Sequence, residues 1–162
     1  MNDLELKLYD WIENFVEVPN KNLNGWSPCP YARKARLEKK IKIVIAEGTE
    51  IFKTVFSNIE CLNQGYEVIV YCFDKSIEPS YFVNATLELN RHKSNSGFIF
   101  LEDHPSIKES INGVEMNFGE CALILAQKVD LLNDSSTQLK KKGYYDVWTR
   151  ENLEDVVEWR NK

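Results

Sequence analysis

The sequence predicts a single α/β domain, built as a two-layer or three-layer sandwich around a mostly parallel βαβαβ sheet. Three observations lead to this prediction. Apolar runs at 41–46, 66–73 and 98–101 alternate with segments of helical periodicity at 51–62 and 79–91. Helical crossovers between consecutive strands favour parallel pairing with right-handed connections. A chain of 162 residues, 43% of them hydrophobic, suits one domain with one core.

The first element that the pattern predicts is an amphipathic N-terminal helix over 3–18. Its apolar residues recur at helical spacing: Leu4, Leu8, Trp11 and Phe15. Pro19 ends this helix, and the Asn- and Pro-rich residues 19–28 form a loop. A short basic helix over 30–40 follows, with Pro30 as its first residue.

The strand-and-helix core extends over 41–102, with a turn at 94–97, and a polar loop over 103–119 follows it. The remaining part, 120–161, is predicted to be largely helical. Apolar residues keep helical spacing over 121–132, so a helix is favoured there, with an edge strand over 121–126 as the alternative. Thr149 is the expected N-cap of the last helix.

Charge is distributed unevenly along this acidic chain, whose net charge is −5. Residues 33–42 hold six of the 20 basic side chains and one acid, so the rest carries 14 basic and 24 acidic groups. An anionic protein is repelled by a nucleic-acid backbone, which disfavours nucleic-acid binding. The cations at 33–42 would attract a small phosphorylated or carboxylated ligand, or would form a solvated helix face.

Cysteine usage and hydropathy indicate a cytoplasmic protein. The longest apolar run, 121–126, is far too short for a membrane span, and the N-terminus lacks the basic region of a signal peptide. The four cysteines, at 29, 61, 72 and 121, form no Cys-x-x-Cys pair, which argues against a disulfide scaffold or a structural zinc site. We therefore expect no metal site, and no motif names a cofactor.

Cys29 is the strongest candidate for chemistry in this sequence. Pro28 and Pro30 flank it, and a following proline favours extended backbone at Cys29. Cys29 would then be the cap residue of the basic helix. A thiol at a helix N-terminus beside cations has a lowered pKa. The sequence therefore predicts a reactive thiol at this position.

Other residues complete the predicted site. Arg33 and Lys34 would anchor an anionic group, and Trp26 and Tyr31 would line the ligand pocket. His104 follows the third strand, where open α/β sheets bind ligands, so it would serve as base or proton donor beside the Cys29 nucleophile. Asp103 would orient this histidine. The alternative is a structural His104 that packs its loop.

Two resemblances involve the same residues. Cys29-Pro30-Tyr31-Ala32 resembles the Cys-Pro-Tyr-Cys active site of glutaredoxins, with alanine in place of the second cysteine. Pro28-Cys29-Pro30-Tyr31-Ala32 and Asp103-His104-Pro105 resemble the Cys-Pro-Phe-Ala-like segment and the Phe-His-Pro-like motif of the uncharacterised bacterial domain-of-unknown-function family 1415. This second resemblance covers roughly residues 3–105. It implies that the cysteine and the histidine both occupy motif positions.

These features leave three functional hypotheses. The leading one is a small-molecule enzyme or binding protein with an anion-attracting site at Cys29 and His104. The second is a non-catalytic interaction protein, such as a phage or bacterial accessory factor, which docks a protein partner through the basic helix at 33–42 and the acidic last helix. The third is a monothiol redox module, as the glutaredoxin resemblance implies.

Overall fold

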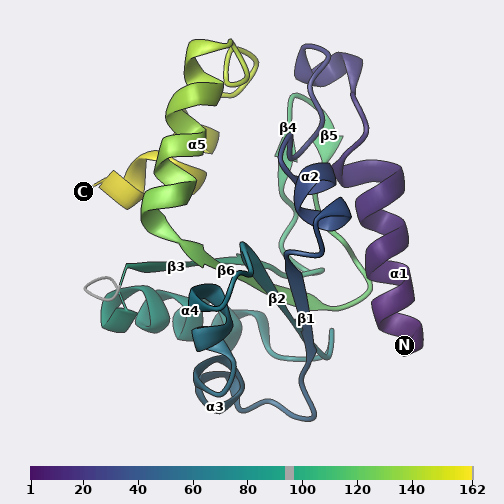
Figure 1. Ribbon diagram of the computed structural model, residues 1–162, viewed down its shortest axis with the longest axis vertical. Coiled ribbons are helices and arrows are strands. Elements are labelled where there is room, and N and C mark those ends of the chain that lie inside the picture. The colour runs from purple at the N-terminus through teal and green to yellow at the C-terminus, as the bar shows by residue number, and fades with distance from the viewer. Residues whose placement is uncertain (94–96, 162) are drawn as a thin grey trace.

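The centre of the molecule is a four-stranded mixed sheet in the order β1-β2-β6-β3 (Figure 1). A computed structural model describes residues 1–93 and 97–161, so the turn predicted at 94–97 lies outside the described residues except for Gly97. The strands of the sheet are β1 (Ile41–Ile45), β2 (Val68–Phe73), β3 (Phe98–Asp103) and β6 (Ala122–Lys128). Helices and sheet together confirm the predicted α/β class.

The sheet differs from the prediction in the direction of one strand. β1 and β2 pair in parallel, with Ile41 opposite Val68. β6 runs antiparallel to both of its neighbours, β2 and β3. The three strands predicted for the core therefore do point the same way, but β6 is inserted between the second and the third. The prediction of a mostly parallel sheet was wrong because no crossover helix marks this returning strand.

The inserted strand also corrects the helix favoured at 121–132. β6 ends at Lys128, and helix α5 (Val129–Lys141) begins directly after it. Ala122 and Ile124 face one side of the sheet and Leu123 the other, and all three are at most 1% exposed. A strand covered on both faces is apolar throughout, so its periodicity does not separate it from a buried helix. The strand alternative is correct, but the strand is central rather than at an edge.

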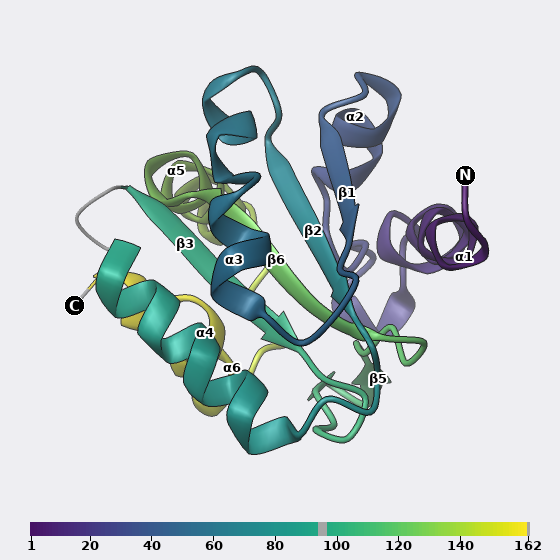
Figure 2. The ribbon, with the colours of Figure 1, turned by 90° about the horizontal axis from the view of Figure 1, so that it is seen from below.

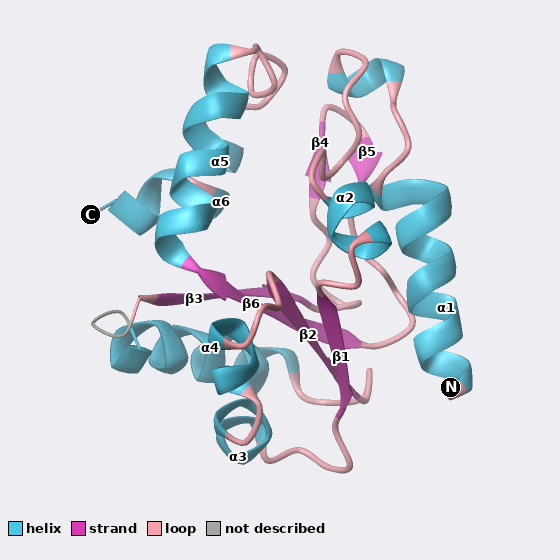
Figure 3. Ribbon diagram, viewed as in Figure 1, coloured by secondary structure: helices cyan, strands magenta, loops and turns pink. Residues whose placement is uncertain are grey.

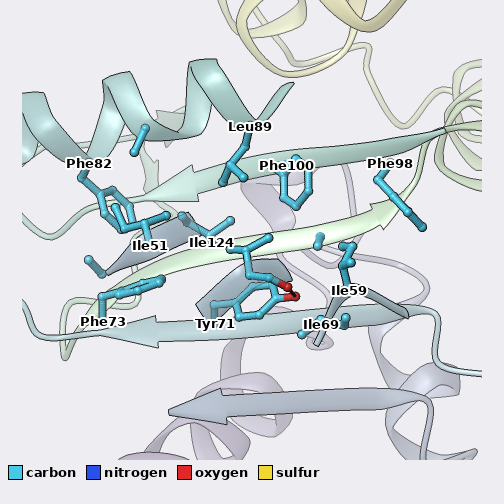
Figure 4. Packing of buried hydrophobic residues seen from close by; sticks show 14 of the residues in the cluster. Ile51, Ile59, Ile69, Tyr71, Phe73, Phe82, Leu89, Phe98, Phe100 and Ile124 are labelled. Atoms are coloured by element: carbon cyan, nitrogen blue, oxygen red, sulfur yellow. Dashed lines mark hydrogen bonds between the residues drawn. The ribbon is translucent and has the colours of Figure 1, made fainter. Parts of the chain in front are cut away.

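Two helices and a 3₁₀ segment cover one face of the sheet: α3 (Ile51–Phe56), η3 (Ile59–Asn63) and α4 (Pro79–Lys93) (Figure 2). Their apolar residues pack on the side chains that β2, β3 and β6 turn toward them. Figure 4 shows this core, in which the rings of Phe73 and Phe82 meet edge to face with centroids 5.8 Å apart. Its further members include Ile51, Val55, Ile69, Tyr71, Leu89, Phe100 and Ile124.

The opposite face carries the N-terminal helix and the C-terminal part, so the domain has three layers (Figures 1 and 3). α1 (Asp3–Trp11) continues as a π-helical turn, Ile12–Val16, which confirms the predicted helix over 3–18 to within two residues. α1 and α2 (Ala32–Leu37) pack over β1, β2 and β6. α5 lies above the other end of the sheet, with α6 (Arg150–Val156) and η5 (Glu158–Asn161) after it.

The predicted polar loop at 103–119 contains a short hairpin. β4 (Ser110–Ile111) and β5 (Val114–Glu115) are joined by Asn112 and Gly113, whose φ values of 48° and 80° suit a tight hairpin turn. The hairpin packs on the η2 segment (Lys21–Leu23) through a small third core of Leu23, Ile111 and Val114.

Thr149 caps α6 as predicted, in a capping box with Asn152. No helix among the described residues is long and apolar enough to cross a bilayer.

Candidate functional site

Cys29 lies in the connection between η2 and α2, fixed by two backbone hydrogen bonds. Its N–H donates to the Val16 carbonyl at 2.9 Å, and its own carbonyl accepts from the Ala32 N–H at 3.1 Å. α2 begins at Ala32 with Tyr31 as its cap, and it ends at Leu37. The helix predicted over 30–40 is therefore shorter, and Cys29 is not its cap residue. The Pro30–Tyr31 turn separates Cys29 from the helix.

The environment of the Cys29 thiol also differs from the prediction. Burial raises the pKa of this thiol, although the N–H groups of Tyr31 and Ala32 act in the opposite direction, as expected near a helix start. Cys29 as a residue is nevertheless exposed, so water reaches it and limits the shift. The direction of this shift is opposite to the predicted lowering of the pKa, so the environment of Cys29 favours the neutral thiol.

An aromatic cluster stands beside Cys29, formed by Trp26 of the same loop and by Tyr144, Tyr145 and Trp148 of the C-terminal part. The Tyr144 hydroxyl donates to the Pro28 carbonyl at 2.5 Å, and the Trp26 ring meets the Tyr144 ring edge to face at 5.8 Å. Tyr145 and Trp148 pack at 5.0 Å. Electrostatic interaction with Cys29 contributes to raised pKa values of both tyrosines, after burial as the main cause. The cluster therefore lies against the Pro28–Cys29 segment.

Apart from Trp26, these rings were not among the predicted site residues. Tyr144 hydrogen-bonds to a residue 116 positions away, which no local pattern encodes. The concentration of rings in Tyr144-Tyr145-Asp146-Val147-Trp148 was the signal that could have indicated it. Arg160 contacts the cluster: its guanidinium donates to the Ser136 hydroxyl at 2.9 Å and interacts with Tyr145.

Internal ion pairs neutralise part of the basic segment. Arg36 pairs with Glu13 at 2.8 Å and with Glu17 at 2.7 Å. Lys40 pairs with Glu38 at 2.7 Å and with Glu67 at 3.0 Å. Arg36 thus ties α2 to the end of the N-terminal helix, and Lys40, just before β1, is tied to the residue that precedes β2. The segment therefore offers less free charge to a partner than its sequence indicates.

The cations nearest to Cys29 in sequence remain available. Arg33 and Lys34 are exposed, as is the Tyr31 side chain at 38%. Lys34 is 4.0 Å from Glu38, the outer limit of an ion pair, and Arg33 makes no ion pair with any described residue. Hydrogen bonding from Arg36 is the main cause of the lowered pKa of Glu17, and Arg33 makes a smaller contribution to it. Glu17 follows Val16, whose carbonyl binds Cys29, so Arg33 acts on a carboxylate next to this contact.

His104 is a buried side chain with both ring nitrogens engaged. It is 2% exposed, its Nε2 lies 2.8 Å from the Ile77 carbonyl, and its Nδ1 accepts from the Ser106 N–H at 3.0 Å. Because Nδ1 accepts, Nε2 carries the proton and donates, which defines a neutral tautomer. Phe82 meets the imidazole edge to face at 5.6 Å.

These contacts do not bring His104 and Cys29 together. Ile77 and Phe82 belong to the core on the α3 and α4 face of the sheet, whereas Val16, which binds Cys29, packs in the core on the opposite face. No hydrogen bond or ring contact joins the two residues in the described part of the chain. The predicted dyad stays a prediction, and the arrangement favours the structural alternative for His104.

Asp103 binds the chain that follows the hairpin. Its Oδ1 accepts from Asn117 Nδ2 at 2.6 Å and its Oδ2 from the Phe118 N–H at 2.9 Å. Burial raises the pKa of this carboxyl, and these two donors partly offset that effect. Both carboxylate oxygens are thus used for holding 117–118 against β3, rather than for orienting an imidazole.

Within residues 1–93 and 97–161, no group of three His, Cys, Asp or Glu side chains is placed to hold a metal ion.

Comparisons of the chain with family models, with curated proteins and with solved structures gave no significant match. The resemblance to family 1415 is therefore still a prediction.

Proposed function

We propose that this chain is a small-molecule-binding protein that holds an anionic ligand at the surface beside Cys29. The proposed site comprises Cys29 and the aromatic cluster, with Arg33 and Lys34 as the nearest exposed cations in the sequence. The observation that carries the proposal is that Cys29 is exposed next to the aromatic cluster, whose Tyr144 hydroxyl donates to the Pro28 carbonyl. Aromatic walls with a few polar groups are typical of ligand sites in proteins.

Binding fits these contacts better than thiol catalysis does. A nucleophilic or redox cysteine works as its thiolate, and burial raises the pKa of Cys29 and so favours the neutral thiol. A base beside the sulfur would be needed to activate it, and His104 uses both nitrogens on backbone groups. A neutral thiol still contacts a ligand well as a small, polarizable group.

The two alternatives have weaker support. The interaction hypothesis relies on the cations at 33–42, of which Arg36 and Lys40 are held in ion pairs. The monothiol redox hypothesis relies on a reactive Cys29, and the raised pKa of its thiol works against it.

Alkylation with two reagents of different charge tests the proposal. Iodoacetate is an anion and iodoacetamide is neutral, and both react with the same thiolate, so the ratio of their rates cancels the thiolate fraction. We expect this ratio at Cys29 to exceed the ratio measured for glutathione under the same conditions. The excess should decrease when Arg33→Gln removes the nearby cation, and it should decrease with added salt.

The control is the exposed cation Lys53, which lies on α3 across the sheet. Lys53→Gln removes the same charge from the protein and should leave the ratio unchanged. A ratio at or below that of glutathione, or equal losses in both variants, would contradict an anion-attracting site at Cys29.

A further inference from the structure

An open groove runs along one side of α1. Its volume is about 490 Å³, which lies within the range of small-molecule sites in proteins. Two walls form it: α1 with its π-helical turn, and the segment between β5 and β6, which passes beside α1 in Figure 1. None of its lining residues belongs to the site proposed at Cys29.

Three half-buried aromatic rings line the groove. The Trp11 and Phe15 rings stack with their centroids 5.8 Å apart and an interplanar angle of 26°. Phe118, from the opposite wall, meets the Trp11 ring at 5.2 Å. Aromatic ring faces that are partly open to solvent attract cations through the negative charge of their π systems. These rings are therefore suited to a cationic ligand with an apolar body.

The π-helical turn is a second, independent indication of a site. The Glu17 N–H donates to the Ile12 carbonyl at 3.0 Å, five residues back instead of the four of an α-helix. Turns of this kind are rare and are frequently found at functional sites. This turn carries the lining residues Asn14 and Phe15 and begins directly after Trp11. The irregular part of the helix therefore coincides with the groove.

The charges of the groove also favour a cation. Two carboxylates and one basic group line it: Asp10, Glu120 and Lys7. The Lys7 Nζ bridges the two walls, since it lies 3.6 Å from Glu120, and it also pairs with Asp3 at 3.3 Å. Asp10 makes no ion pair with a described residue, and its Oδ1 accepts a hydrogen bond from Asn14 Nδ2 at 2.8 Å. The negative charge of Asp10 is therefore left to attract a ligand.

We propose that this groove binds a small organic cation, a quaternary ammonium or a protonated amine, whose charged end lies over the aromatic rings and beside Asp10. Trp11 and Phe118 contact the carbon groups around the charge, as ring faces do in other sites for such cations. Because Lys7 repels a cation and is paired with Glu120, the charged end lies nearer to Asp10. The groove and the anion site proposed at Cys29 share no residue, so the failure of one leaves the other intact.

Choline is the probe that tests this site, and the comparison is its neutral analogue, in which a tert-butyl group replaces the trimethylammonium group. Binding is followed through the indole N–H signals of the four tryptophans in nitrogen–proton NMR spectra. Trp11→Phe assigns the Trp11 signal by removing it. We expect choline to shift this signal saturably and to leave the other three unchanged. The neutral analogue should bind roughly fivefold more weakly, because it lacks the charge that the ring faces and Asp10 attract.

Asp10→Asn should weaken choline binding roughly two- to fivefold, the size of an exposed charge interaction, and Asp134→Asn, which removes the same charge from α5, should not weaken it. Phe118→Leu should weaken binding by a similar factor, whereas Phe52→Leu on α3 should leave it unchanged. Asp10 is exposed, so Asp10→Asn keeps the fold even if Phe118→Leu does not. The proposal fails if choline does not shift the Trp11 signal, if the neutral analogue binds equally well, or if the two aspartate variants bind choline alike.

Discussion

His104 shows how a single residue can match a motif and still have a structural role. Its two nitrogens bind the Ile77 carbonyl and the Ser106 N–H, so the imidazole joins the loop after β3 to the segment before α4. Removing one partner of a buried hydrogen bond costs about 1–3 kcal/mol. The histidine therefore stabilises the loop.

His104→Ala should lower the free energy of unfolding by about 2–3 kcal/mol, measured by urea denaturation, because it leaves two buried backbone groups unpaired. Alkylation of Cys29 at fixed pH should be unchanged. His104→Gln provides a milder variant if the alanine variant does not fold. Slower alkylation of Cys29 with unchanged stability would instead support the dyad.

Tyr144 joins the aromatic cluster to the Pro28–Cys29 segment. Tyr144→Phe keeps the ring packing but removes the donor to the Pro28 carbonyl. We expect a loss of about 1 kcal/mol in unfolding free energy and faster alkylation of Cys29, because the Pro28–Cys29 turn loosens. Tyr9→Phe is the control, since the Tyr9 hydroxyl makes no hydrogen bond with a described residue. Equal effects of both variants would remove Tyr144 from this role.

The sequence predicted part of this site and missed the rest for a physical reason. Cys29, Arg33 and Trp26 stand in one local stretch, so the pattern of prolines and cations indicated them. The pKa of the thiol depends on how much protein surrounds it, and Tyr144 and Tyr145 approach it only through the tertiary fold. Composition and spacing contain no information on that approach.

At the level of elements, one edge of the central sheet is shielded. Asn90 of α4 binds the outer edge of β3, donating to the Phe100 carbonyl at 2.9 Å and accepting from the Phe100 N–H at 2.8 Å. Free strand edges promote association between chains, so Asn90 blocks further pairing at this point of β3.

Asn90→Ala should destabilise the fold by about 1–2 kcal/mol, because it frees two backbone groups of β3. It should also increase self-association, measured by sedimentation. Asn84→Ala on an exposed position of the same helix should change neither quantity. A stable, monomeric Asn90→Ala protein would contradict the role of this side chain.

The elements also show where sequence periodicity is sufficient and where it is not. α1, β1, β2, α4 and β3 lie where the pattern predicts them, because each has a distinct apolar period and clear terminating residues. The apolar residues of the β6 segment fit a helix as well as a strand, because a strand buried on both faces lacks the alternation of apolar and polar residues. Its central position depends on pairing with β2 and β3, which are remote in sequence.

For the whole molecule, the carboxyls of Glu102, Asp103 and Glu109 share a raised pKa, so each favours folding when protonated. The pKa of Glu109 rises from 4.5 to about 7. Its contribution to stability is therefore full below about pH 4.5 and is lost as the pH rises through about 7. Glu17 and Glu78 have lowered pKa values and contribute in the opposite sense, at higher pH.

Glu109→Gln should thus match the natural chain in stability at pH 4.5 and exceed it at pH 8, by less than about 1 kcal/mol because the side chain is exposed. Urea denaturation at the two pH values measures both differences. A variant that is less stable than the natural chain at pH 8 would show that the ionised Glu109 is favourable in the fold.

The proposed role of Cys29 as a neutral thiol is tested most directly by the pH dependence of its alkylation rate, followed by mass spectrometry of the Cys29 peptide so that Cys61 is scored separately. We expect a midpoint above that of an ordinary free thiol, about 8.5. A midpoint clearly below that value would contradict this role, because Cys29 would then be an activated thiolate.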